Sequence, residues 1–172
     1  VSFSFFLPAM ARIVARGRAI PPDQPPMTRI QRHALVMHSA SRMFHLVNEV
    51  EDYPSYFGWC EKATVLERAE SEMVARLDVR VAGLKAHFTT RNRWVEPTRL
   101  DLELVDGPFK KLEGHWTFHA LDEEACKVSL SLEFDVAGAL VGNALAIGFQ
   151  GLADRLVDDF CRIAKAEDRW RA

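Results

Sequence analysis

The sequence has 172 residues, of which 48% are hydrophobic and 27% are charged, and its formal net charge is −2. This length is typical of one domain, and the apolar content is sufficient for a packed core. The slight negative charge excludes nucleic-acid binding driven by overall charge, although a local basic patch is compatible with it. Cys60, Cys126 and Cys161 are far apart and form no metal-ligand spacing. They predict neither a disulfide framework nor a zinc site, and they are typical of a reducing cytoplasm.

Residues 1–26 differ in character from the rest of the chain. An apolar stretch up to Leu7 is followed by three arginines and by the proline-rich sequence PPDQPP. A secretory signal has its positive charge before the apolar stretch, so this order does not match one. We expect 1–26 to be an extension that is either disordered or the product of a mis-called start, and expect the domain to fold without it. A cleaved targeting segment or a membrane-touching arm is the alternative. Residues 27–172 are predicted to form a single domain.

The first predicted elements are a strand from Arg29 to Met37 and a helix that follows it. Ser39 is a suitable N-cap, because its hydroxyl can accept a hydrogen bond from an exposed amide of the first helical turn. Apolar residues then recur at helical spacing, at Met43, Phe44, Val47 and Val50. Because proline cannot continue the helical hydrogen-bond ladder, the segment Glu51-Asp52-Tyr53-Pro54 is predicted to end this helix.

Alternation of apolar and polar residues dominates the middle of the chain. It runs through the segments EMVARLDVRVA, LKAHFTTRNRW, RLDLEL, LEGHWTFHAL and KVSLSLEFDV. Such alternation indicates antiparallel strands with one face in the core and the other in water. Ala82-Gly83, 96–98 and 121–124 lie where tight connections are needed. No apolar run reaches the roughly 18–20 residues that a membrane-spanning helix requires.

The end of the chain predicts one long amphipathic helix. Its apolar stripe has steps of three or four residues and consists of Val141, Leu145, Phe149, Leu152, Leu156, Phe160 and Ile163. Such a helix can cover the apolar face of the sheet. The predicted fold class is therefore α+β, a helix-grip fold in which a curved antiparallel sheet of about six to seven strands wraps around a long C-terminal helix. Small inward residues (Ala75, Ala86, Gly114, Ala120) would either widen a cavity or accommodate the helix.

Two segments carry a family resemblance: LVNEVEDYPSYFGWC at 46–60 and LVDGPFKKLEGHWTF at 104–118. With FTTRNRW between them, they resemble signature stretches of the START-like (Bet v 1-like) family that contains the coenzyme Q-binding proteins and the ribosome-association toxins of the RatA type. The resemblance covers residues 28 to about 168 and departs from many relatives at Gly58, where they have proline. It implies a hydrophobic tunnel. In one branch it implies binding of a ubiquinone-type lipid in support of respiration. In the other it implies binding to the large ribosomal subunit and a block of subunit association. The wider superfamily includes polyketide cyclases.

The candidate ligand-binding residues are inward strand residues, aromatic residues after the first helix, and apolar residues of the last helix. The aromatic segment either rims a tunnel mouth, stacking on a quinone head group, or plugs the open end of the sheet. Phe109 either closes over a ligand or serves a demanding hairpin. The glycine-rich stretch 137–149 is either a lipid gate or a buried helix start. The predicted set is Tyr53, Tyr56, Phe57, Trp59, Leu77, Val79, Phe88, Leu102, Phe109, Trp116, Phe118, Leu130, Leu145 and Phe149.

Catalytic chemistry has little support in the sequence. No nucleophile elbow, metalloprotease motif or glycine-rich phosphate loop is present. His115 and His119 share a strand face but lie about 13 Å apart, too far for one metal ion. No partner carboxylate is recognisable for His45 from spacing. We therefore predict no catalytic residue, no metal and no cofactor, the ubiquinone-like lipid being a bound ligand.

A basic strand face is the candidate for ribosome contact. Its outward residues are Arg76, Arg80, Lys85, Arg91 and Arg93. They would either contact phosphates of ribosomal RNA or form an ordinary solvated strand face, with Asp78 among them.

Three functions remain open at this point. The first is a non-catalytic binder of an isoprenoid quinone or similar lipid. The second is a RatA-type toxin that binds the large ribosomal subunit, with a small antitoxin partner. The weakest is an aromatic polyketide cyclase, because we expect the cavity to lack polar groups that would steer an aldol closure. The expected location is cytoplasmic, with at most peripheral contact at the inner membrane.

Overall fold

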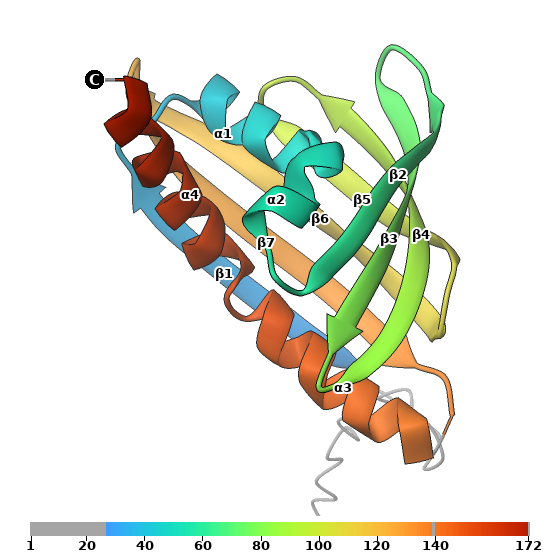
Figure 1. Ribbon diagram of the computed structural model, residues 1–172. Coiled ribbons are helices and arrows are strands. Elements are labelled where there is room, and N and C mark those ends of the chain that lie inside the picture. Colours follow the sequence, from blue (N-terminus) through green and yellow to red (C-terminus); the bar gives the residue numbers. More distant parts are fainter. Residues whose placement is uncertain (1–26, 139, 172) are drawn as a thin grey trace, which may run out of the picture.

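Seven antiparallel strands form one curved sheet in the order β1-β7-β6-β5-β4-β3-β2, seen in the computed structural model in Figure 1. The structure describes residues 27–138 and 140–171. The strands are β1 (Thr28–Val36), β2 (Cys60–Arg68), β3 (Glu72–Val81), β4 (Leu84–Val95), β5 (Arg99–Asp106), β6 (Phe109–Asp122) and β7 (Ala125–Val136). The predicted extension 1–26 lies outside the described residues.

The helices lie on the concave side of the sheet (Figure 1). They are α1 (Ala40–Asn48), a 3-10 turn η1 (Val50–Asp52), α2 (Tyr53–Tyr56), α3 (Leu140–Ala153) and α4 (Leu156–Arg171). The C-terminal pair α3 and α4 runs across the sheet, with α4 ending beside α1, while α1 and α2 close one end. The predicted helix-grip arrangement of a curved sheet around C-terminal helices is therefore confirmed.

The first strand and the helix start agree with the sequence prediction. Ser39 has extended backbone angles, and its hydroxyl accepts a hydrogen bond from the Arg42 amide at 3.2 Å. The role predicted for Pro54 is wrong. The first helix already ends at Asn48, and Pro54 lies in the first turn of α2. Proline fits there because an amide hydrogen in the first turn has no helical acceptor.

Strand β2 is an element that the sequence pattern did not reveal. It is the edge strand beyond β3, and its pairing with β3 shifts register twice, between Cys60 and Lys62 and between Val65 and Glu67. Each irregularity interrupts the alternation of inward and outward side chains, so the period of two that marks the other strands is lost.

The single long C-terminal helix predicted from the apolar stripe is also wrong, because the helix breaks at Asp154 and Arg155. The Arg155 amide donates to the Leu152 carbonyl, a three-residue spacing, at 3.0 Å. Arg32 of β1 donates to the backbone carbonyl of Asp154 at 3.3 Å and also pairs with its carboxylate. The contact with β1 therefore holds the break, while the stripe continues through Leu156 into α4.

The inward strand positions form most of the core. Met73, Ala75, Val79 and Leu130 are all buried. Ala120, predicted to point inward, is instead exposed. The register of β6 against β7 shifts between Ala120 and Asp122, so the end of β6 leaves the regular alternation.

The β5–β6 hairpin depends on Gly107. This residue has φ +144, and a Cβ atom there would lie 2.8 Å from the Phe88 Cβ and 3.1 Å from the Phe88 Cα. The predicted turn at Asp106-Gly107-Pro108 is therefore confirmed, and the glycine has a steric reason as well as a conformational one. The chain packs directly against the backbone of β4 at this point.

We expect Gly107→Ala to lower the free energy of unfolding by about 1–3 kcal/mol, because it combines overpacking with an unfavourable backbone angle. Chemical denaturation followed by circular dichroism measures this. Gly58→Ala is the matched control, since a Cβ at Gly58 meets nothing within 4 Å. Equal stability of the two variants would show that the close approach to Phe88 relaxes at no cost.

Candidate functional site: inner cavity and convex sheet face

An apolar cavity of about 90 Å³ lies between the concave face of the sheet and the helices. The end formed by α1 and α2 contributes Val47, Val50 and Tyr53, with Trp59 from the loop after α2. The sheet contributes Ala75, Leu77, Val79, Phe88, Thr90, Asn92, Leu100, Leu102, Leu112, Trp116, Leu130 and Leu132, and the C-terminal helices contribute Phe149, Leu152, Leu156 and Phe160. None of these lining side chains, all from the part of the chain that the structure describes, is charged.

Most of the predicted ligand-binding residues lie in this wall. They are Tyr53, Trp59, Leu77, Val79, Phe88, Leu102, Trp116, Leu130 and Phe149. Tyr56, Phe57, Phe109, Phe118 and Leu145 lie outside it. Phe118, for example, is 1% exposed and packs in parallel against Trp116, with ring centroids 6.4 Å apart, so it supports the wall from behind. Parity places a side chain on the inner face, but it does not distinguish the cavity lining from the layer that packs around it.

The aromatic segment after α1 is packed on itself. The Tyr53 hydroxyl donates a 2.6 Å hydrogen bond to the Val47 carbonyl, and burial raises the pKa of this phenol. Phe57 stacks on Trp59 with centroids 5.0 Å apart, and the edge of Phe57 meets the ring of Phe160 at 5.1 Å. These contacts favour the plug over the open mouth, and the Tyr53 hydroxyl is already engaged by the backbone.

Phe109 lies in an aromatic cluster at the far end of the core. Its ring is 6% exposed and contacts Phe88, Phe134 and Phe149 with centroid separations of 4.9 to 6.3 Å. The side chain is therefore a core residue that follows the tight hairpin at Gly107. Of the two interpretations of this motif, the structure favours hairpin geometry.

Sequence reasoning missed two polar residues in the cavity wall, Thr90 and Asn92 of β4. They are 7% and 6% exposed. Both lie at alternate positions in line with Phe88 and Trp94 on the same strand. The alternation of β4 therefore already predicts that their side chains point inward. The expectation that the cavity lacks polar groups is wrong at these two positions.

The size of the cavity limits what it can hold in this conformation. Pockets for drug-sized molecules usually measure roughly 300–1,000 Å³. At about 90 Å³ the cavity is below that range, and a larger hollow of about 400 Å³ lies on the outer face of the sheet around Arg91, Asp101 and His115. The inner cavity is therefore where the sequence predicted it, but it is not the dominant hollow of the described residues.

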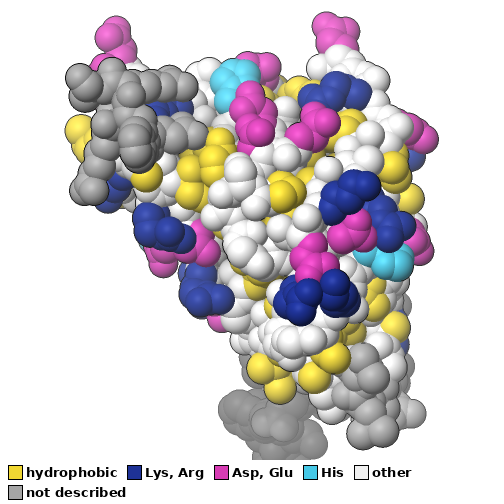
Figure 2. All heavy atoms as spheres, viewed as in Figure 1, with side chains coloured by type: hydrophobic (Ala, Val, Ile, Leu, Met, Phe, Trp, Pro, Cys, Tyr) yellow, Lys and Arg dark blue, Asp and Glu magenta, His cyan; other side chains and the backbone are white. Residues whose placement is uncertain are grey.

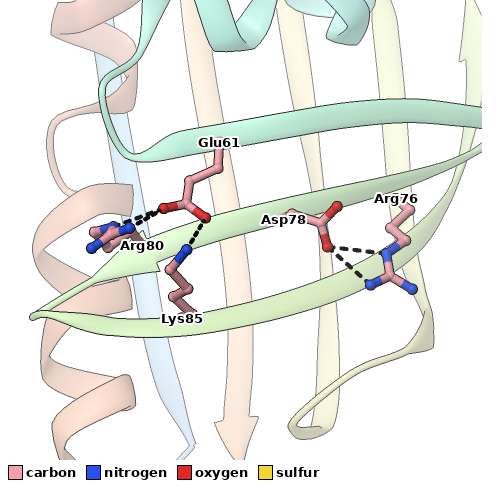
Figure 3. A network of polar contacts seen from close by, with 5 residues as sticks. All are labelled: Glu61, Arg76, Asp78, Arg80 and Lys85. Carbon is pink, nitrogen blue, oxygen red and sulfur yellow. Dashed lines mark hydrogen bonds and ion pairs between the residues drawn. The ribbon is translucent and has the colours of Figure 1, made fainter.

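The predicted basic residues all belong to β3 and β4 and lie on the convex face. Figure 3 shows three of them, Arg76, Arg80 and Lys85, beside the carboxylates that neutralise them. Glu61 pairs with both Arg80 and Lys85 (3.1 Å to the Lys85 Nζ), and these contacts lower the pKa of the Glu61 carboxyl. Arg76 donates to Asp78 at 2.9 Å.

The remaining two cations share a carboxylate in the same way. Glu72 pairs with Arg91 at 3.4 Å and with Arg93 at 2.6 Å, and Arg93 also approaches Glu103. Figure 2 shows acidic and basic side chains adjacent to one another on the visible face. The structure thus supports the solvated, charge-balanced strand face over a patch of single sign.

Helix α3 contains most of the glycine-rich stretch 137–149 that was proposed as a gate. Leu145 and Phe149 are buried, whereas Ile147 is 72% exposed. Gly148 lies against the β3–β4 turn, where a Cβ atom would be 3.0 Å from the Ala82 Cβ. One side of α3 is therefore a packed helix start and the other is an uncharged exposed surface, so both interpretations remain.

Ionisable groups show no catalytic grouping among the described residues. His45 does have a carboxylate partner, Glu96, at 3.1 Å, but both side chains are about half exposed on the surface. Burial raises the pKa of the Cys60 and Cys126 thiols to about 11, so both are protonated at neutral pH. Within residues 27–138 and 140–171, no three His, Cys, Asp or Glu side chains are placed to hold a metal ion, and no helix is long and apolar enough to cross a membrane.

A curved antiparallel sheet closed by C-terminal helices around an uncharged cavity defines a helix-grip, START-like domain. Residues 36–161 match the family described as polyketide cyclase / dehydrase and lipid transport, and the chain belongs to this family.

Relatives and solved structures agree with this assignment. A protein of Pseudomonas aeruginosa named "Ribosome association toxin RatA" is 46% identical over 138 residues, which cover 80% of this chain and 96% of the relative. The protein of the same name from Escherichia coli is 40% identical over 139 residues, covering 81% and 88%. The crystal structure of the Zhui aromatase/cyclase from Streptomyces is similar in fold, with a TM-score of 0.70, 22% identity and coverage of 86% and 98%. The resemblance to RatA proteins is confirmed.

Proposed function

We propose that this chain is a ribosome-associating protein that binds the large subunit and interferes with subunit association. The observation that carries the proposal is the 46% identity to a protein named as a ribosome association toxin, over almost the whole length of that relative. The proposal includes action in the cytoplasm and control by a small antitoxin partner. The absence of a grouped set of catalytic side chains in the described residues fits a role by binding.

The convex face is the proposed contact surface, but its charge balance changes how it would bind. The five basic side chains face Glu61, Glu72, Asp78 and Glu103, so a phosphate must displace a carboxylate partner before it gains an arginine. Such an exchange gives a smaller net electrostatic gain than a free basic patch would. We therefore expect the affinity for the ribosome to depend moderately on salt concentration and to depend also on shape complementarity.

Arg91→Glu tests this surface. We expect the variant to co-sediment less with large ribosomal subunits and to reduce the slope of log affinity against log salt by about 1 or more, because one phosphate contact is lost. Sucrose-gradient sedimentation at several salt concentrations measures both. Arg162→Glu is the control, since Arg162 lies on α4, is exposed and is also paired, with Asp159. Equal losses for both variants would contradict a specific role of the convex face, and no sedimentation of the wild type would contradict ribosome association.

A second candidate function, binding of a hydrophobic ligand, is favoured by the uncharged wall of the inner cavity. An isoprenoid quinone is the proposed lipid, but the 90 Å³ volume requires the wall to open before a quinone head and tail can enter. Native mass spectrometry of the purified full chain, followed by lipid extraction, tests this. A co-purifying quinone supports the proposal, and a protein that stays free of lipid when incubated with quinone vesicles contradicts it.

A further inference from the structure

The cavity wall contains one polar atom that the described residues leave without a hydrogen-bond partner. Asn92 is 6% exposed, and its Oδ1 atom is buried and accepts no hydrogen bond within residues 27–138 and 140–171. A buried amide oxygen without a donor destabilises the folded state, because the oxygen has lost water and gained nothing. Such groups call for a physical reason in a native structure, and a ligand donor is one.

The position of Asn92 on β4 directs its amide at the cavity. Its cross-strand neighbours are Met73 on β3 and Leu102 on β5, and Leu102 lines the cavity with it. Thr90 lies two residues earlier on the same face, about 7 Å away along the strand, and also lines the cavity. Apart from the Tyr53 hydroxyl, which donates to the Val47 carbonyl, and the indoles of the two tryptophans, the polar part of the wall is this one short stretch of β4.

We propose that the inner cavity binds a small neutral phenol, with the phenolic hydroxyl donating to Asn92 Oδ1. The proposal rests on the ligand-binding role of the cavity, but it requires neither an isoprenoid tail nor ribosome binding. A hydroxyl supplies the donor that Oδ1 lacks. A neutral molecule is required because no wall residue is charged and an unpaired charge is costly to bury.

Size and shape select a single aromatic ring. An apolar cavity of about 150 Å³ holds benzene, so a cavity of about 90 Å³ admits one substituted ring only after its wall widens, and it excludes a molecule of several rings. Trp116, Phe149 and Phe160 are part of this wall and offer ring edges and faces to an aromatic guest. A larger guest would have to displace them.

The test compares p-cresol with toluene, which differ by one hydroxyl group, by isothermal titration calorimetry on the full chain. Asn92→Leu removes the acceptor while keeping a similar volume. We expect the affinity for p-cresol relative to toluene to fall about tenfold in this variant compared with the wild type. Toluene binding itself is expected to persist.

Asn48→Leu is the matched control. Asn48 is 9% exposed and its Oδ1 also has no partner among the described residues, but it lies outside the cavity wall. We expect both variants to have a raised melting temperature, and only Asn92→Leu to change the ratio of affinities. Asn92→Ala is a second variant, in case leucine does not fit between Met73 and Leu102.

The possible results of these titrations have different consequences for the proposal. An unchanged ratio in both Asn92 variants overturns the anchoring role of Asn92 while leaving the cavity as an apolar site. Binding of neither compound overturns the phenol proposal, whereas the hydrophobic-ligand function is contradicted only if the protein also stays free of lipid in the quinone experiment. In NMR spectra, shifts of the indole N–H signals of Trp59 and Trp116 on addition of p-cresol would place the ligand in the cavity. Binding of p-cresol without such shifts would contradict that placement.

Discussion

Phe160→Ala is expected to lower the free energy of unfolding by about 3–5 kcal/mol, because it removes a fully buried aromatic ring that joins three parts of the molecule. Phe160 on α4 is 0% exposed. Its ring meets Tyr53 and Phe57 from the α2 region and Trp116 from β6, with centroids 5.1 to 5.5 Å apart. Loss of the ring therefore loosens the last helix from both the sheet and the closed end.

Urea denaturation followed by circular dichroism and by tryptophan fluorescence measures this effect. Ile147→Ala is the control, because Ile147 is 72% exposed on α3, and its loss is expected to change the stability by about 0.5 kcal/mol or less. A Phe160→Ala loss below about 1 kcal/mol would show that α4 is not anchored through this ring.

The sequence was sufficient to predict the architecture where the periodicity is regular. The alternation in β3, β4 and β7 and the apolar spacing within α3 and within α4 each reflect one repeating geometry. Prediction from the sequence failed where a tertiary contact decides the local structure. Arg32, distant in sequence, holds the helix break at Asp154, and no residue at the break predicts it. Two register shifts concealed β2 in the same way.

The sequence could predict which face of the sheet each site residue lies on, but not which of those residues line the cavity. Parity put Leu77 and Trp116 in the cavity wall correctly, but it also selected Phe118, which lies in the layer behind them. Alternation can show that Arg80 and Lys85 point outward, yet it cannot show that both share Glu61 of β2. Cavity volume depends on how side chains from several elements interlock, and that information is not present in any one segment.

Ala75→Leu is expected to abolish ligand binding in the inner cavity without unfolding the protein. Ala75 is 2% exposed at the centre of β3 and lines the cavity. A leucine there extends into the hollow and occupies the space a ligand would use. At roughly 24 cal/mol per Å³ of cavity, complete filling of about 90 Å³ would raise the stability by about 2 kcal/mol. Imperfect fit reduces this gain, so we expect a change between about 0 and +2 kcal/mol.

This variant separates loss of the cavity from loss of the fold, which a charged substitution in the same wall would not do. Calorimetry with p-cresol and quinone measures binding, and denaturation measures stability. Ala63→Leu is the control, because Ala63 is half-buried on edge strand β2 and does not line the cavity. Undiminished binding by a folded Ala75→Leu protein would place the ligand elsewhere. We expect the same variant to co-sediment with ribosomal subunits as the wild type does, since the convex face lies on the other side of the sheet. Reduced co-sedimentation would mean that the cavity and the ribosome contact are coupled.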